Sequence, residues 1–165
     1  MKKAICLFLC CISLLLCFGC TEEAPEIQEG LCLYYPAAQL SYQPGSRAIG
    51  SESRTLDEHA DLAQILNIYF RGPEAEYLLP AFPVGLRIVK TTTEDKTVYI
   101  TVSSHMAELS GLELTMACAC LTLTTLELTG AETVVINAED ALLDGQKSIT
   151  MDKNTLLLTD IWQEE

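Results

Sequence analysis

The stretch that decides the fold runs from Gly111 to Thr129 and has the sequence GLELTMACACLTLTTLELT. We predict a helix here, and at about 100° per residue its apolar side chains fall on two nearly opposite sides. A helix that is apolar on two sides contacts two layers of structure. One stripe consists of Leu112, Met116, Ala119, Leu123 and Leu126, and the other of Leu114, Ala117, Leu121 and Leu128.

Two interpretations of the second stripe are open. In one, the helix packs on a sheet with one side and on the first helix of the chain with the other. In the alternative, Leu114, Ala117, Leu121 and Leu128 form a surface for a partner. Exposure of these side chains would favour the partner surface, whereas their contact with the sheet or the first helix would exclude it.

The first helix is predicted from Thr55 to about Arg71. Thr55 and Glu58 have the spacing of a capping box at its start. Gly72-Pro73 ends it, because these residues are typical of a helix C-terminus. Its apolar face consists of Leu62, Ile65, Leu66, Tyr69 and Phe70.

The segment after this helix, Phe70 to Gly85, combines apolar and aromatic side chains with three prolines. Proline fixes φ and removes a backbone donor, so the segment forms neither helix nor strand. We interpret it as a rigid connector whose side chains cover the end of the core. The alternative is that it lines a ligand pocket. The residues assigned to this capping loop are Pro73, Tyr77, Leu79, Phe82, Pro83 and Gly85.

The remaining patterns predict strands, of which the clearest alternates Val98, Ile100 and Val102 with polar residues. With the helices they predict an α+β fold, in which a mixed β-sheet has two α-helices packed on one face of a single domain, residues 31–165. A body of this length buries about two-thirds of its unfolded surface. The predicted strands are Leu31–Pro36, Arg47–Ser53, Arg87–Thr92, Thr97–Ser103, Thr133–Asn137, Lys147–Met151 and Leu156–Ile161.

The N-terminus has the pattern of a secretory signal, since a short basic start precedes an apolar run that ends near Phe18. Gly19-Cys20 resembles the cleavage site of bacterial lipoproteins, although Cys17 and Phe18 depart from the usual residues. The resemblance implies a signal peptide at 1–19, a lipid on Cys20, a tether at 20–30 and a location on the extracytoplasmic face of the cell membrane. Acyl chains would anchor the protein, because each buried methylene contributes about 0.8 kcal/mol.

Charge and cysteines exclude several classes of protein. Loss of Lys2 and Lys3 with the signal takes the net charge from −13 to −15, which disfavours nucleic acid as a partner. Beyond the anchor, the body keeps Cys32, Cys118 and Cys120, too few for a disulfide framework. Buried free thiols are the simpler interpretation, and one bond from Cys32 to either of the others stays open.

No catalytic residues are predicted. His59 and His105 are the only histidines, and no Asp or Glu is placed by sequence to complete a triad with Ser103 or Ser104. The sequence contains no phosphate loop, dinucleotide motif or nucleophile elbow. We therefore expect no enzyme activity, no cofactor and no metal.

The order of these features resembles the GerMN domain of the sporulation and spore germination protein GerM and of many bacterial surface lipoproteins. The resemblance covers Leu31 to about Ile136. Departures are Thr124, where the family commonly has Asn, and the segment Asn137–Asp140, where it has a Gly-rich strand end. The matching residues are Leu33-Tyr34-Tyr35-Pro36, Arg71-Gly72-Pro73, Pro83 with Gly85, Val102-Ser103, Thr125-Leu126 and Val134-Val135-Ile136.

The resemblance implies a lipid-anchored interaction domain outside the cytoplasmic membrane. We expect it to serve in sporulation, germination or envelope assembly, by self-association or by docking to a membrane complex. The competing class is a small-ligand or cell-wall binding module that uses a groove between the proline loop and the sheet. A deep polar pocket near Tyr35, Tyr77 and Arg87 would favour that class.

Overall fold

The structure is a computed structural model that describes residues 30–38, 48–55 and 59–156. The predicted signal peptide, Cys20 and nearly all of the tether lie outside the described residues, as does the predicted strand beyond Leu156. The elements follow the order β1 (Leu31–Pro36), β2 (Ile49–Arg54), α2 (Leu62–Tyr69), β3 (Ile88–Glu94), β4 (Thr97–Val102), η1 (Ser104–Glu108), α3 (Gly111–Thr129), β5 (Thr133–Ala138) and β6 (Ile149–Asp152).

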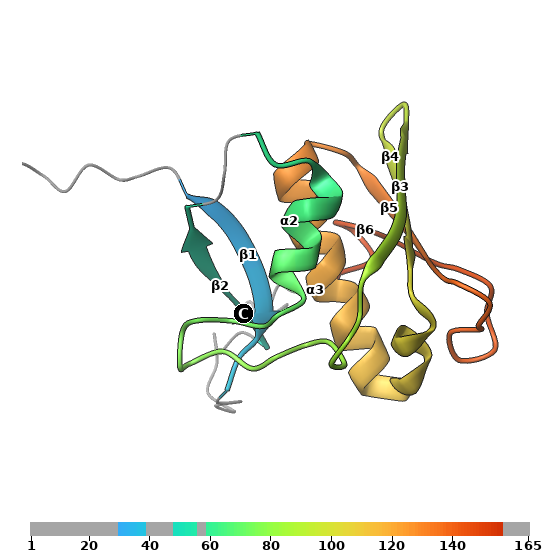
Figure 1. Cartoon of the computed structure of the whole chain (residues 1–165), viewed down its shortest axis with the longest axis horizontal. Coiled ribbons are helices and arrows are strands. Elements are labelled where there is room, and N and C mark those ends of the chain that lie inside the picture. The colour runs from blue at the N-terminus through green and yellow to red at the C-terminus, as the bar shows by residue number, and fades with distance from the viewer. Residues whose placement is uncertain (1–29, 39–47, 56–58, 157–165) are drawn as a thin grey trace, which may run out of the picture.

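The described elements form three layers, and the middle layer holds both helices (Figure 1). On one side lies the antiparallel pair β1–β2, and on the other lies a sheet in the order β3-β4-β5-β6. The larger sheet is mixed, because β4 and β5 are parallel while its other pairs are antiparallel. A parallel pair needs a long crossover, which η1 and α3 supply. The predicted α+β class, with a mixed sheet and two helices on one face, is confirmed.

Helix α3 has the predicted bounds. Gly130 ends it in the left-handed conformation, with φ 68°, and its N–H donates to the carbonyl oxygen of Leu126 at 2.9 Å. By length and composition α3 could cross a membrane, but most of it is buried between the two sheets. That burial accounts for its apolar composition.

The partner surface predicted on α3 is wrong. Leu114, Ala117 and Leu121 are buried in the main core with β1, β4 and β5, and Leu128 is partly buried against the same core. The prediction of two layers was right, but the second layer is mainly the small sheet, whose strand β1 lies along α3. The alternation of apolar residues indicates how many layers a helix contacts, and not which elements form them.

Helix α2 is shorter than predicted. It begins at Leu62, and the residues just before it, Ala60 and Asp61, are not helical. The capping box consists of Asp61 and Gln64: the Asp61 carboxylate accepts from the Gln64 N–H at 2.8 Å, and the Gln64 side chain accepts from the Asp61 N–H at 3.0 Å. Glu58 of the predicted box lies outside the described residues.

The strands β1 to β6 agree with their predictions to within two residues at each end. β1 has the predicted bounds, and Pro36 ends it. The hairpin of β3 and β4 turns at Asp95-Lys96, where Asp95 adopts φ 52°. The inward residues of β4 are Val98, Ile100 and Val102, which are fully buried. The period-two pattern therefore identified the core face of the larger sheet.

Candidate functional site

The proline loop, residues 73–85, leaves α2 and crosses to β3 over the end of the core. Phe82 is 9% exposed, and its ring lies 5.0 Å from Tyr69 and 4.7 Å from Phe70, measured between centroids. Tyr77 and Leu79 are instead exposed, at 62% and 47%. Of the residues assigned to the capping loop, Phe82 therefore enters the core, Pro73 and Pro83 are partly buried, and Tyr77, Leu79 and Gly85 face outward.

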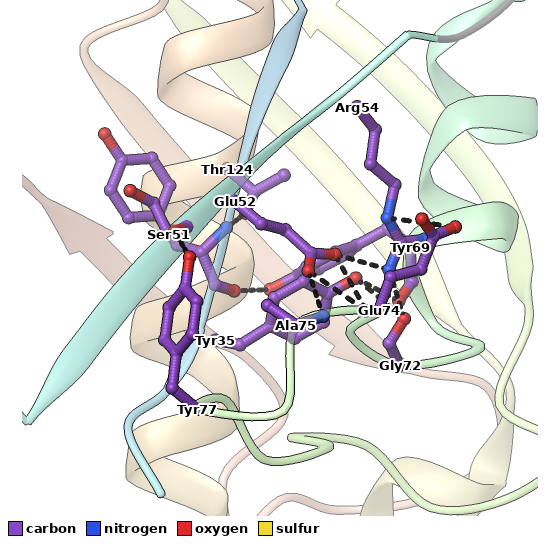
Figure 2. Close-up of polar contacts among 11 residues, drawn as sticks. Tyr35, Ser51, Glu52, Arg54, Tyr69, Gly72, Glu74, Ala75, Tyr77 and Thr124 are labelled. Atoms are coloured by element: carbon purple, nitrogen blue, oxygen red, sulfur yellow. Dashed lines mark hydrogen bonds and ion pairs between the residues drawn. The ribbon is translucent and has the colours of Figure 1, made fainter.

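A buried charged cluster holds the start of this loop against the small sheet (Figure 2). We call it the Arg54 cluster and define it as Tyr35, Glu52, Arg54, Gly72 and Glu74, of which Glu74 is exposed. Arg54 forms an ion pair with Glu52, and both side chains are more than nine-tenths buried. Nη2 of Arg54 also donates to the carbonyl oxygen of Gly72 at 2.6 Å. The guanidinium thus joins β2 to the segment that ends α2.

The carboxylate of Glu52 completes the attachment. It accepts hydrogen bonds from the backbone N–H groups of Glu74, at 3.0 Å, and of Ala75, at 2.8 Å. Farther out, the Tyr77 hydroxyl donates to the carbonyl oxygen of Ser51 at 3.2 Å. A buried charge is tolerated only when it is paired and hydrogen-bonded, and these contacts meet that requirement.

Two buried tyrosines link α2 and the residues at its end to β1. The Tyr35 hydroxyl donates to the carbonyl oxygens of Tyr69, at 3.0 Å, and Gly72, at 3.3 Å. The Tyr69 hydroxyl donates to the carbonyl oxygen of Tyr34 at 2.5 Å. Burial raises the pKa of both phenols well above their ordinary value, although Arg54 opposes the rise in the pKa of Tyr35. Both therefore stay protonated donors to the backbone.

Thr124 of α3 supports the same strand. Its hydroxyl oxygen accepts from the N–H of Tyr34 at 3.0 Å, so Tyr34 is bound to α3 through its N–H and to α2 through its carbonyl. Thr124 occupies the position at which the resembling family commonly has Asn. An Asn side chain also offers an oxygen acceptor, so Thr retains the capacity for this bond.

The serine and histidine after β4 are placed for structure. Ser103 is 1% exposed, and its hydroxyl oxygen lies 3.2 Å from Nδ1 of His105. The N–H of Arg87 donates to the same hydroxyl at 3.3 Å. Ser103 is therefore shielded from solvent, and its hydroxyl contacts both a side chain and a backbone group. His59 is exposed and lies before α2, away from this pair.

The three cysteines in the described part of the chain, Cys32, Cys118 and Cys120, are free. Cys118 and Cys120 are fully buried in α3, and burial raises the pKa of each thiol from 9.0 to about 12. Since the thiolate is the nucleophile and the metal ligand, both are poor at either role. Within the described ranges, no three His, Cys, Asp or Glu side chains come together as metal ligands.

A groove of about 360 Å³ lies between the proline loop and the N-terminal half of α3. Its exposed rim includes Leu79 and Leu112, of which Leu112 is 77% exposed. The sequence had placed Leu112 and Met116 on an apolar stripe, but no local pattern predicted that they would face the loop. The groove is lined by Pro36, Leu79, Pro80, Ala81, Phe82, Pro83, Leu109, Leu112, Glu113 and Met116.

This groove is not at the position expected for a polar ligand pocket. Tyr35 is fully buried, while Arg87 is exposed and lies 3.8 Å from Glu139. Tyr77 is bound to Ser51 on the outer side of the loop. The three residues do not line the groove, and the described residues that do line it are apolar apart from Glu113.

Comparison with known proteins gives one finding. A family model described as Germane, sporulation and spore germination, matches residues 32–144, which is more than half of the chain. No curated protein and no solved structure matches the chain. The match includes β1, both helices, the proline loop and β5, the elements that carry the resemblance described above. The chain therefore belongs to the Germane family of sporulation and spore germination domains.

Proposed function

We propose that this protein is a non-catalytic docking domain of sporulation or germination. A lipid on Cys20 holds it at the extracytoplasmic face of the cell membrane, and its folded body binds a protein of the cell envelope. The family match supports the role in sporulation or germination. The apolar N-terminal run and Gly19-Cys20 support the anchor.

The observation that carries docking is a rigid loop with exposed apolar side chains. Val84 is 97% exposed at the end of the proline loop, and Leu79 of the loop and Leu112 of α3 are exposed where they line one groove. The Arg54 cluster fixes the other end of this loop. Apolar side chains that gather on a surface mark contact sites, and a loop that is already ordered loses little entropy when a partner binds.

The polar side chains that converge in the interior support binding rather than chemistry. Nη2 of Arg54, the carboxylate of Glu52 and the hydroxyl of Tyr35 each contact backbone groups or one another. A catalytic acid or base must instead reach a substrate within hydrogen-bond distance. These residues therefore contribute stability and order to the loop.

The alternative is a small-ligand binding lipoprotein. The groove volume of about 360 Å³ lies within the range of small-molecule sites. Its lining favours an apolar ligand over a cell-wall sugar, because Glu113 is the one charged side chain among the described residues that line it. Binding of a fluorescent apolar probe that Met116→Gln abolishes would favour this alternative.

The experiment that tests the anchor compares the protein with its Cys20→Ala variant in cells of a sporulating bacterium. We expect the protein to incorporate a labelled fatty acid and to sediment with membranes, and the variant to do neither. Equal sedimentation of both forms, without label, would refute the lipid anchor.

Docking is tested with a photo-crosslinking residue at position 84. We expect it to capture one identifiable envelope protein in sporulating cells. The matched control is position 142, because Leu142 is also exposed, at 54%, but lies in the loop between β5 and β6. Recovery of monomer alone from position 84, or of the same products from both positions, would contradict docking by the proline loop.

A further inference from the structure

The groove between the proline loop and α3 has an apolar lining open to water. Leu112 is 77% exposed and Leu79 is 47% exposed on opposite walls. Contact of apolar surface with water is unfavourable, at about 25 cal/mol per Å². A segment that covered these walls would therefore gain free energy.

The chain itself comes close to this groove at its last described residue. Leu156 is 9% exposed and belongs to a buried cluster with Ile49, Ala119 and Cys120. Ala81 and Met116 pack against the same cluster, and both also line the groove. The segment after Leu156 therefore starts beside the groove.

A hydrogen-bonded turn precedes this starting point. The carboxylate of Asp152 accepts from the N–H of Asn154, at 2.8 Å, and of Thr155, at 2.7 Å. The N–H of Leu156 then donates to the carbonyl oxygen of Asp152 at 3.2 Å. These bonds turn the chain at the end of β6 and place Leu156 in its cluster.

We propose that residues 157–162, with the sequence LLTDIW, lie in the groove and cover its apolar walls. Four of these six side chains are apolar, as the groove requires. Six extended residues reach roughly 20 Å, whereas Met116 and Leu112 are about one helical turn, or 6 Å, apart along α3. The segment is therefore long enough to span the groove.

A segment of the same chain has two advantages over a second copy. It is tethered at Leu156, which gives it an effective concentration on the order of millimolar. A second copy would bring another body with a net charge of −13, which repels the first.

The inference goes beyond the proposed function, because it holds whether or not the protein carries a lipid. An envelope protein that used the groove would first have to displace residues 157–162.

Trp162 is the single tryptophan of the chain, so its fluorescence reports on this segment alone. In the purified native protein we expect Trp162 to emit at a shorter wavelength than it does in urea. We also expect iodide to quench its emission several-fold less than in urea. Leu112→Gln should move both values towards those of the unfolded chain. Leu79→Gln, on the opposite wall, should do the same, and Leu142→Gln, an exposed leucine away from the groove, should change neither.

Circular dichroism of each variant checks that it is folded. Native emission equal to that in urea would overturn the inference, as would native emission that neither groove variant changes. A blue shift that disappears on dilution, together with dimers in sedimentation, would assign the groove to a second copy and overturn it as well. None of these measurements involves a membrane or an envelope protein, so failure here is distinguishable from failure of the proposed function.

Discussion

Nη2 of Arg54, on β2, donates to the carbonyl oxygen of Gly72 at 2.6 Å, and both residues are buried. The two residues are 18 apart in sequence. The bond connects the small sheet to the end of α2 and so to the first residue of the proline loop. Because Nε of the guanidinium also lies 3.7 Å from Oε1 of Glu74, a single side chain connects β2, the end of α2 and the proline loop.

Arg54→Met should lower the free energy of unfolding by about 3 kcal/mol. The substitution keeps much of the side-chain volume but leaves the Glu52 carboxylate buried without its cation, which is strongly destabilising. Urea unfolding followed by circular dichroism measures the change. Lys96→Met is the matched control, because the Lys96–Glu132 pair is exposed and should contribute less than about 1 kcal/mol. Equal losses in the two variants would show that the Arg54 cluster is unimportant for stability.

Gly72→Ala should cost about 1–2 kcal/mol of folding free energy. Gly72 adopts φ 99°, a region that a residue with Cβ rarely occupies. An added Cβ would lie 3.6 Å from Cβ of Pro80, an ordinary contact, so the cost arises in the backbone. Thermal unfolding measures it, with Glu76→Ala as an exposed control in the same loop, for which we expect a change within about 0.5 kcal/mol. A melting temperature as high as that of the control would contradict the strained conformation.

The local signals of the sequence predicted most elements but not their partners. Gly130 and Pro36 end α3 and β1 where expected, because each acts through its own backbone. The start of α2 was wrong because Thr55 with Glu58 and Asp61 with Gln64 both have capping-box spacing. Sequence spacing alone does not decide between two such boxes.

The Arg54 cluster could not be predicted from the sequence. Glu52 and Arg54 lie in a short strand of weak alternation, where charged side chains usually face water. Their burial depends on backbone N–H groups of Glu74 and Ala75, which are more than 20 residues away. The groove was not predicted either, because its two walls, the proline loop and α3, are distant from each other in sequence. The prolines predicted a rigid connector that is neither helix nor strand, but not what lies opposite it.

Stability should fall as the pH rises above about 9. Cys118 and Cys120 each have an ordinary thiol pKa of 9.0 that burial raises to about 12. In the unfolded chain the thiols ionise near pH 9, while in the folded chain they stay neutral. Their contribution is therefore full below pH 9 and is lost as the pH rises towards 12, by about 1 kcal/mol per thiol at pH 10.

The measurement compares urea unfolding at pH 7.5 and pH 10 for the protein and for Cys118→Ala/Cys120→Ala. The double variant is less stable at both values, but its loss between them should be smaller by about 2 kcal/mol. Cys32→Ala is the control, because its side chain is only partly buried. An identical pH dependence in all three proteins would mean that the α3 thiols ionise equally well in the folded chain.

Replacing Thr122 or Thr124 of α3 by valine should change the free energy of unfolding in opposite directions. Thr122 and Thr124 are both fully buried, but the Thr122 hydroxyl has no hydrogen-bond partner among the described residues, whereas that of Thr124 accepts from the N–H of Tyr34. Valine has nearly the same shape and is also β-branched, so helix propensity hardly changes. Thr122→Val should raise the free energy of unfolding by about 1 kcal/mol, because it removes a buried unpaired hydroxyl.

Thr124→Val should instead lower the free energy of unfolding by about 2 kcal/mol, since it takes the acceptor from the N–H of Tyr34 on β1. Urea unfolding of both variants gives the sign and size of each change. Hydrogen exchange at Tyr34 adds a local measurement, because its amide should exchange faster in Thr124→Val and not in Thr122→Val. Changes of the same sign in the two variants would show that α3 and β1 are joined by packing alone and that the bond between them adds nothing.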